Sequence, residues 1–328
     1  MRDVARVAGV SQTTVSFVIN DVPEVHIPQA TRERVWAAVT RLGYRPNAIA
    51  RGLRRDATDT IGFVSNHVAA TPFAGRMIQG AQDAAWERGK LLILVTTGGD
   101  PAVEARALAM LVDRRVDGIM YASMDQSVVE PGRQLRELPA VLLDAQTVDG
   151  SLPSVVPDEE SGAFAATSVM LDAGRSRIAF LNCADPTPAA ARRLAGFRRA
   201  LEERGLPFDG AFVRSCPAVN GSGYRAAWAL LGEDEAPTGL LCFNSQIAIG
   251  AYQALAGRKL DVPEDAAVVG FDDHELIAPC LRPGLSTVAL PHYEMGRWAV
   301  EHLLEVIAGS TPGVQHRMPC RYVARESV

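Results

Sequence analysis

The chain of 328 residues has little that is typical of a membrane or exported protein. Its hydrophobic residues, 48% of the total, are spread along the sequence. No stretch approaches the roughly 18 uninterrupted apolar residues that a transmembrane helix needs. The start, MRDVARVAGVSQ, contains neither the apolar segment nor the small-residue cleavage site of a secretion signal. We therefore expect a cytoplasmic protein, and the length predicts two or three domains.

Cysteine is scarce, and the few cysteines are far apart in the sequence. There are five, and none forms a CxxC pair: Cys183, Cys216, Cys242, Cys280 and Cys320. An odd, scattered set of this kind argues against a disulfide framework and against a zinc cluster. We expect buried thiols and no metal ion.

The signatures of several enzyme classes are also missing, because no HExxH, Walker, GxGxxG or GxSxG pattern occurs. The polar run at residues 272–275 is a poor metal or glycosidase site. Neighbouring residues do not converge on one ion, and glycoside hydrolysis needs two carboxyl groups that face each other across a substrate. We expect neither an enzymatic activity nor a cofactor.

Net charge is small, at −5, but its distribution along the chain is uneven. Residues 1–55 contain nine arginines and four acidic residues, a net charge of +5, so the remainder of the chain carries −10. A small basic segment that precedes a larger acidic one is typical of a protein that presents one end to the phosphates of a nucleic acid.

Residues 1–45 are predicted to form three short helices. The first covers residues 3–8 and ends at Gly9, and the second covers residues 12–20 with Ser11 as its N-cap. The third runs from residue 28 or 31 to 42, where Gly43 ends it, with Val35, Trp36 and Val39 on one face. The spacing of the first two helices indicates a helix-turn-helix. Residues 48–55 are predicted to add a helix too short to be stable alone.

From residue 60 onward, apolar runs alternate with helical patterns. Strands are predicted at 61–65, 91–96, 118–122, 140–143, 178–182, 239–243 and 267–271. Continuous apolar runs of this length are typical of parallel strands covered on both faces. Between them, Asp100 and Pro101 begin one helix, and five helices are predicted to end at Gly89, Gly174, Gly205, Gly257 and Gly309. The fold class is therefore α/β and doubly wound.

The strand pattern restarts after a break near residues 153–158, which predicts two similar lobes with a cleft between them. We expect a DNA-binding domain at residues 1–45, a hinge helix and linker at 46–59, and an effector-binding core at 60–328. One lobe of the core would take about 60–157 and 290–317, and the other about 158–289 and 318–328. Ligands of such sheets bind beyond the carboxyl ends of the strands.

At this point the sequence resembles the LacI/GalR family of bacterial transcription regulators. DVARVAGVSQTTVSFVIN is similar to the family's helix-turn-helix signature, and TRERVWAAVTRLGYRPNAIARGL to its third helix and hinge. VDGIM, RRLAGFRRAL, VPEDAAVVGFDD, LSTVALPHYEMG and ARES are similar to motifs of its core. The resemblance implies a helix-turn-helix head on a two-lobed core of the periplasmic-binding-protein type. Members of the family usually carry several more residues before the position of Met1.

For DNA, the resemblance places base-reading residues at the start of the second helix. Gln12 suits adenine, Thr13 offers a hydroxyl and a methyl group, and Phe17 offers only apolar contact, where relatives more often have a polar residue. Thr14, Ser16, Asn20 and Arg34 are expected to contact phosphates. In the hinge, Leu53 is expected to wedge into the minor groove, with Asn47, Ala48 and Arg54 beside it.

For a small-molecule effector, the residues that follow the predicted strands are Ser65, Asn66, His67, Phe73, Asp144, Arg193, Asn244 and Asp272. The resemblance implies that Arg193 and Asp272 are the most recurrent contacts, and Ser245 replaces the second residue of the family's usual Asn-Asp pair. Asp and Asn suit hydroxyl-rich ligands, and Phe73 offers a face to a sugar or base. Arg193 can instead recognise a carboxylate or phosphate through its fork of donors, and both interpretations stay open.

The resemblance thus predicts a homodimeric DNA-binding repressor of transcription that binds a near-palindromic operator and is switched by a sugar or related metabolite. A two-lobed solute-binding protein and a sugar-active enzyme are the alternatives. The first would carry a signal peptide and no DNA-binding head, and the second would turn over its ligand.

Overall fold

A computed structural model describes residues 1–22, 25–44, 57–66, 74–219, 221–310 and 313–328. The chain divides into two compact units, residues 1–59 and 60–328. We call them the head and the core and describe each by itself.

Three helices make up the described part of the head: α1 (Arg2–Ala8), α2 (Gln12–Ile19) and α3 (Gln29–Leu42). Gly9 and Gly43 follow α1 and α3 in the left-handed conformation, with φ of 65° and 55°, which glycine adopts without steric cost. The Ser11 hydroxyl accepts a hydrogen bond from the Thr14 backbone N–H at 3.0 Å, as expected of an N-cap. These helix ends confirm the sequence prediction.

A small apolar core holds the three helices of the head together. Its most completely buried members come from all three helices, namely Val4, Val15, Val18 and Val35. The predicted apolar face of α3 was partly wrong, because Trp36 is 47% exposed and Ala38 is buried instead. An Ala side chain fits the narrow space where α3 meets α1, whereas Trp36 lies about 100° around the helix from Val35.

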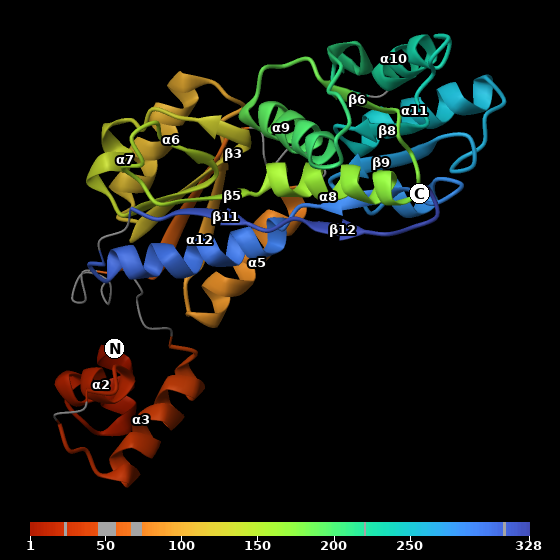
Figure 1. Ribbon diagram of the computed structural model, residues 1–328. Coiled ribbons are helices and arrows are strands. Elements are labelled where there is room, and N and C mark those ends of the chain that lie inside the picture. Colours follow the sequence, from red (N-terminus) through yellow and green to blue (C-terminus); the bar gives the residue numbers. More distant parts are fainter. Residues whose placement is uncertain (23–24, 45–56, 67–73, 220, 311–312) are drawn as a thin grey trace. The chain divides into compact units, whose positions relative to one another are not determined.

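The core contains two six-stranded sheets (Figure 1). The first, in the order β11-β5-β4-β3-β1-β2, is parallel throughout. Its strands are β1 (Thr60–Ser65), β2 (Leu91–Thr96), β3 (Gly118–Val128), β4 (Ala140–Gln146), β5 (Ser154–Pro157) and β11 (Gln315–Met318). The accompanying helices are α5 (Ala74–Glu87), α6 (Pro101–Asp113), α7 (Arg133–Glu137) and α12 (His292–Ile307). We call this assembly the first lobe.

The second sheet has the order β12-β10-β9-β8-β6-β7, in which only β12 runs antiparallel to its neighbour. Its strands are β6 (Ile178–Cys183), β7 (Val213–Cys216), β8 (Gly239–Cys242), β9 (Ala267–Phe271), β10 (Ser286–Ala289) and β12 (Arg321–Val323). With it go α8 (Glu159–Asp172), α9 (Pro188–Glu203), α10 (Ser222–Leu230), α11 (Ser245–Gly257) and the 3-10 turns η2 (Gly210–Phe212) and η3 (Ala278–Cys280). This is the second lobe.

The chain passes between the lobes three times in the described residues. It crosses from β5 to α8, from β10 to α12, and from β11 to β12 (Figure 1). Because each lobe is built from discontinuous segments, the first lobe is complete only after the second crossing and the second lobe only after the third. The crossings also bring residues near 158, 291 and 319 to the junction of the lobes.

All seven predicted strands are present, and the five that were missed are short or lie near proline. β5, β7, β10, β11 and β12 have only three or four residues each, too few to show a clear apolar period. Four of the five predicted helix-ending glycines have positive φ, but Gly257 does not. It is the last residue of α11, and Lys259, with φ of 59°, makes the left-handed turn in its place.

Close helix pairs cover the sheets, and glycines lie at their points of contact. An added Cβ at Gly80 of α5 would lie 2.0 Å from the carbonyl oxygen of Tyr293 in α12, and one at Gly296 would lie 2.1 Å from that of Met77. An added Cβ at Gly196 of α9 would likewise lie 2.1 Å from the carbonyl oxygen of Glu160 in α8. The helix pairs α5–α12 and α8–α9 therefore pack backbone against backbone, and a methyl group would force them apart.

We predict that Gly80→Ala destabilises the core, although alanine is the better helix former by about 0.5–1 kcal/mol. Overpacking typically costs about 1–3 kcal/mol, and the clash with backbone atoms places this site at the upper end. Gly75→Ala is the control, since it lies on the same helix and its Cβ would meet nothing within 4 Å. Urea unfolding measures both variants. Equal midpoints for them would contradict the packing described.

Candidate functional site

The N-terminal end of α2 is the candidate DNA-reading surface of the head. Gln12 and Thr13 are exposed there, immediately after the Ser11 cap. The hydroxyl groups of Thr14 and Ser11 lie 2.9 Å apart, which holds Thr14 beside the cap. The first turn of this helix therefore presents two side chains that can form hydrogen bonds with base edges.

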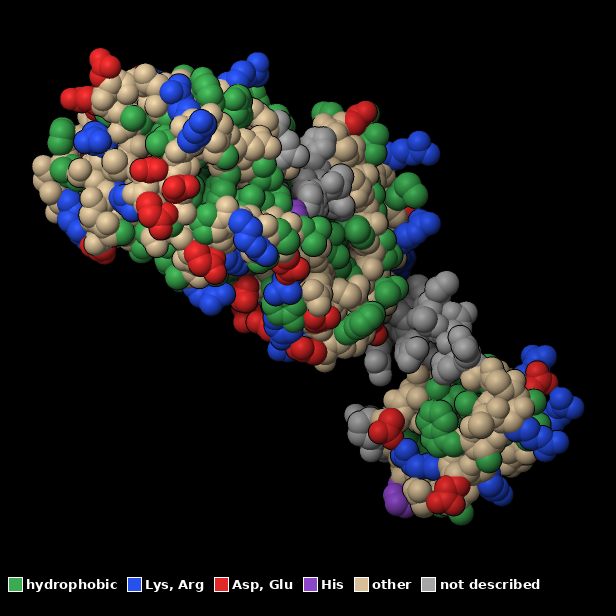
Figure 2. Space-filling model, turned by 90° about the vertical axis from the view of Figure 1, so that its right-hand side faces the viewer, with side chains coloured by type: hydrophobic (Ala, Val, Ile, Leu, Met, Phe, Trp, Pro, Cys, Tyr) green, Lys and Arg blue, Asp and Glu red, His purple; other side chains and the backbone are tan. Residues whose placement is uncertain are grey.

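Further along α2, the predicted contacts are partly engaged within the head. Phe17 is half-buried and packs against the head's apolar core. The Asn20 amide donates to the backbone oxygen of Ser16 at 2.7 Å and lies 3.2 Å from its hydroxyl oxygen. Arg34 is exposed and donates to Thr31 at 3.3 Å. In the face shown, arginine side chains gather along one edge of the head (Figure 2).

Six of the predicted site residues lie outside the described residues. They are Asn47, Ala48, Leu53 and Arg54 of the hinge, and His67 and Phe73 of the effector site. Their roles stay predictions.

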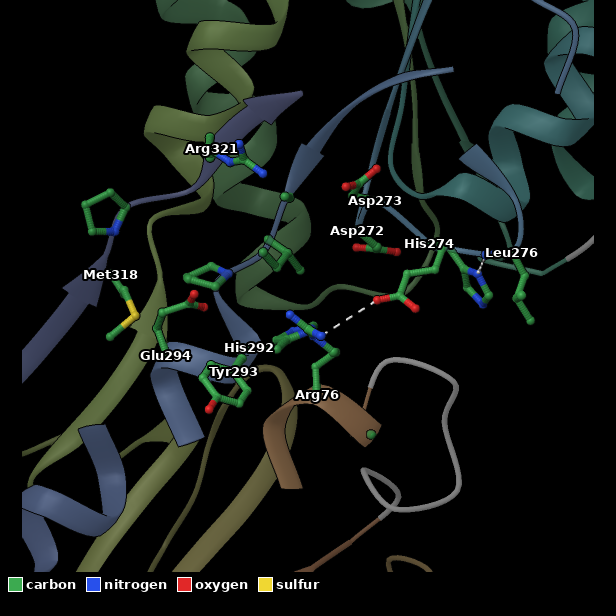
Figure 3. Close-up of a pocket in the computed structure, with 16 residues that line it drawn as sticks. Arg76, Asp272, Asp273, His274, Leu276, His292, Tyr293, Glu294, Met318 and Arg321 are labelled. Atoms are coloured by element: carbon green, nitrogen blue, oxygen red, sulfur yellow. Dashed lines mark hydrogen bonds and ion pairs between the residues drawn. The ribbon is translucent and has the colours of Figure 1, made fainter. Parts of the chain in front are cut away.

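In the core, a cavity of about 830 Å³ lies at the junction of the lobes. Four segments line it: the start of α5, the loop after β9, the crossing from β10 into α12, and the crossing from β11 to β12. Figure 3 shows Asp272, Asp273 and His274 on one side, and Arg76, His292 and Tyr293 on the other. Across the cavity, Nη1 of Arg76 in the first lobe lies 4.0 Å from Oε1 of Glu275 in the second lobe.

Three predicted effector residues lie in or directly after strands of the first lobe. Ser65 is fully buried at the end of β1, and its carbonyl oxygen accepts from the Thr97 N–H at 2.8 Å. The Asn66 amide donates to the Ser123 hydroxyl at 2.8 Å. Asp144 is buried in β4 with a left-handed φ of 51°, a conformation that costs free energy outside glycine and is common at functional sites.

The other three belong to the second lobe. Asn244 follows β8 and caps α11, where its side chain accepts from the Ile247 N–H at 2.8 Å. Asp272 follows β9 with φ of 78°, and it lines the cavity. Arg193 of α9 is buried beneath it, with a guanidinium nitrogen 3.7 Å from an Asp272 carboxylate oxygen. Ser245, at the position where the family usually has Asp, donates to the Phe271 carbonyl at 2.8 Å.

The cavity thus brings together some of the predicted residues and not others. Among the described predictions, Asp272 is part of its lining and Arg193 contacts Asp272. Ser65, Asn66, Asp144 and Asn244 are not part of the lining. Ser65, Asn66 and Asn244 end or follow strands as expected, whereas Asp144 lies inside β4, which continues to Gln146 and not only to the predicted residue 143. In this arrangement of the lobes all four lie outside the cavity lining.

Sequence comparisons agree with this architecture. Residues 1–47 match the pattern of bacterial regulatory proteins of the lacI family, and residues 167–328 match a periplasmic binding protein-like domain. The ribose operon repressor of Escherichia coli (strain K12) is 36% identical over 317 residues, which cover 95% of this chain and 94% of that protein. The chain belongs to the lacI family.

Other similar proteins extend over the whole chain. The HTH-type transcriptional repressor PurR of Vibrio vulnificus is 33% identical over 94% of this chain and 91% of its own length. The structure of the Lac repressor dimer bound to operator and the anti-inducer ONPF superposes with a TM-score of 0.83 at 28% identity, covering 99% of this chain and 97% of that one. As a member of the lacI family, the chain is a DNA-binding transcription regulator.

Among the described residues, no helix is long and apolar enough to cross a membrane. They also contain no group of three or more His, Cys, Asp or Glu residues that could hold a metal ion.

Sequence reasoning missed two residues of the site, Glu159 and His292. Glu159 begins α8 directly after β5, a strand of four residues that was not predicted, so the residues after it were not considered. His292 begins α12 and is 8% exposed. Burial, together with the positive charge of Arg193, lowers the pKa of His292 from 6.5 to about 4. His292 is therefore neutral at physiological pH.

This depressed pKa predicts a pH-dependent stability. Between pH 6.5 and 4 the unfolded chain binds a proton at His292 that the folded chain rejects, so the free energy of unfolding falls as the pH is lowered. From above pH 6.5 to below pH 4, this proton lowers the free energy of unfolding by about 3 kcal/mol in total. Denaturant unfolding at several pH values measures it. His292→Gln, which cannot titrate, is expected to lose less stability on acidification, and parallel pH profiles would contradict the assignment.

Proposed function

We propose that the chain is a repressor that binds a near-palindromic operator as a homodimer and responds to a sugar or related metabolite held between its lobes. The observation that carries this proposal is Asp272, whose carboxylate lines the cavity between two lobes of a chain that also has a helix-turn-helix head. A carboxylate that faces a cavity is a strong acceptor for ligand hydroxyl groups.

The similar proteins support this class of ligand. One similar structure is a LacI family regulator from Enterococcus faecium with bound ribose, at 25% identity and a TM-score of 0.67. Another is the transcriptional regulator CelR in complex with cellobiose, at 29% identity and a TM-score of 0.72. Both ligands are sugars with many hydroxyl groups, which suits the acceptors of this cavity.

We propose that a hydroxyl group of the ligand donates a hydrogen bond directly to the Asp272 carboxylate. Ser65, Asn66 and Asn244, which end or directly follow β1 and β8, would supply further donors and acceptors once the lobes close on it, and Asp144 of β4 would add a carboxylate. In the head, Gln12, Thr13 and Phe17 would read bases, while Thr14, Ser16, Asn20 and Arg34 would position the module on phosphates.

Exposed apolar side chains of the first lobe support the dimer. β2 is an edge strand, and Leu91 and Leu94 on it are exposed, as is Trp86 at the end of α5. Val103 and Met110 of α6, the helix that follows β2, are exposed too. Large apolar side chains are costly to leave in water and are enriched at subunit interfaces. Sedimentation of the full chain gives its mass in solution, which we expect to be twice 35.1 kDa.

The control of operator binding by the ligand follows from thermodynamic linkage between the two binding sites. A ligand that binds one arrangement of the lobes more tightly shifts the chain toward it, and it changes operator affinity only by the difference between its affinities for the two arrangements. We further infer that the protein acts in the cytoplasm and releases its ligand unchanged, because its relatives are regulators and none of the enzyme signatures is present.

The test is a thermal-shift screen of ribose, cellobiose, nucleosides and polyols, followed by calorimetry of the strongest binder. Asp272→Ala is expected to weaken its binding about 10- to 100-fold, because an unsatisfied ligand hydroxyl costs about 1–3 kcal/mol. Operator binding without ligand is expected to stay near that of the unchanged chain.

Glu275→Ala is the matched control, since Glu275 also lines the cavity but its side chain is 77% exposed. Its ligand affinity is expected to change little. Arg193→Ala is a poorer probe because it leaves the buried Glu159 carboxylate without its partner. A chain that responds to no compound in the screen, or Asp272→Ala with unchanged affinity, would contradict the proposed site.

A further inference from the structure

Beneath the cavity, Glu159 of α8 and Arg193 of α9 form a buried ion pair. Arg193 Nε donates to Glu159 Oε2 at 2.7 Å, and Nη2 donates to Oε1 at 3.0 Å. Both side chains are only 3% exposed. The two parallel hydrogen bonds make this the bidentate arrangement by which a guanidinium also recognises an external carboxylate or phosphate.

The remaining surfaces of the Arg193 guanidinium are occupied as well. The rings of Phe243 and Phe271 lie on it with centroids 4.2 and 4.1 Å from the central carbon. Nη1 donates to the carbonyl oxygen of Phe243. A ligand therefore cannot stack on the guanidinium. To reach the bidentate fork, an anion would have to displace Glu159.

Arg193 is not part of the cavity lining, but it lies next to it. Its Nη2 lies 3.7 Å from Oδ1 of Asp272, a lining residue, and its positive charge lowers the pKa of His292, which is another. It holds Asp272 in place from below. Arg193 therefore has two acidic neighbours, Glu159 and Asp272, and the three side chains together carry a formal net charge of −1 beside the cavity.

The cavity lining itself favours a ligand without negative charge. Among the described residues of the lining, the ionisable ones other than histidine and tyrosine are four acids and two arginines: Asp272, Asp273, Glu275, Glu294, Arg76 and Arg321. Asp273 is paired outside the cavity with Arg325 at 2.7 Å. Even without Asp273, the acids outnumber the arginines, and His292 adds no positive charge at physiological pH.

We infer that Glu159 determines the charge of the ligand: by occupying the fork of Arg193, it makes the cleft select uncharged, hydroxyl-rich molecules and reject their phosphate or carboxylate forms. Arg193 is then a positioning residue that acts through Asp272. This inference rests on the proposed function and resolves the choice between hydroxyl and anion recognition that the sequence leaves open.

Arg76 and Arg321 are the rival cations, because they line the cavity and are exposed. Charges that remain in contact with water attract an anion only weakly. Arg76 also lies 4.0 Å from Glu275 and 5.5 Å from the centre of the Tyr293 ring. An anion held by these two arginines would bind the unchanged chain, which the experiment below detects.

The experiment measures the binding of inorganic phosphate by calorimetry at constant ionic strength, in the full-length chain and in Glu159→Gln. Glutamine keeps the size of the side chain but frees the positive charge of Arg193. We expect Glu159→Gln to bind phosphate at least about tenfold more tightly than the unchanged chain. Glu159→Asp keeps the charge and is expected to reject phosphate as the unchanged chain does.

Glu160→Gln is the matched control. Glu160 is the next residue of α8 and also pairs with an arginine of α9, Arg199, at 2.7 Å, but that pair is partly exposed and away from the cavity. This variant removes the same charge from the same helix turn, and its phosphate affinity is expected to stay unchanged. Melting curves of all variants show whether they are folded.

A second arm compares ribose with ribose 5-phosphate in the unchanged chain, so it does not depend on any variant folding. We expect the phosphate ester to bind at least about tenfold more weakly than ribose. Tighter binding of the ester, or equal phosphate affinity of the unchanged chain and folded Glu159→Gln, would overturn the inference while leaving a ligand-binding regulator in place. If no compound of the earlier screen binds, the proposed function fails, and the inference fails with it.

Discussion

The buried ion pair of Glu159 and Arg193 is the interaction on which the floor of the cleft depends. It joins the start of α8 to α9, and through Arg193 it reaches Phe243 after β8 and Asp272 after β9. Two charges that are withdrawn from water cost several kcal/mol each unless they are closely paired, so the ends of these elements must meet with precise geometry. The same geometry sets Asp272 at the surface of the cavity.

The three crossings between the lobes explain how a ligand there can influence the whole core. Glu159 follows the first crossing, His292 lies at the second, and Arg321 follows the third. Any change in the angle between the lobes must be accommodated at these positions. Because α5 and α12 pack backbone against backbone at Gly80 and Gly296, the first lobe is expected to respond as a rigid unit.

Much of this could be predicted from the sequence, because the features concerned are local. Ser11, Gly9 and Gly43 mark helix ends through their own conformational preferences, and the longer apolar runs are of strand length, too short for buried helices. Trp36 and Gly257 show where local reasoning stops. Burial on one side of α3 and the exact turn after α11 depend on neighbouring elements, which a single sequence does not reveal.

The candidate site shows the same division. Asp272 and Arg193 were found because they follow recognisable strands or motifs, and the structure places them in contact. Glu159 was missed because β5 is too short to be recognised, and the pairing of Glu159 with Arg193 joins residues 34 positions apart. Whether an arginine is available to a ligand depends on such a partner, so the sequence could name Arg193 but could not say what already occupies it.

The central claim is that one chain combines a DNA-binding head with a separately folded core. The most direct measurement is the affinity for duplex DNA at several salt concentrations, for the full chain and for the fragment 58–328. The account predicts that the logarithm of the DNA affinity of the full chain falls steeply and linearly with the logarithm of the salt concentration, because binding to the DNA phosphates releases counterions. It also predicts that the folded fragment does not bind. If the fragment bound duplex DNA as tightly as the full chain does, the account would be contradicted.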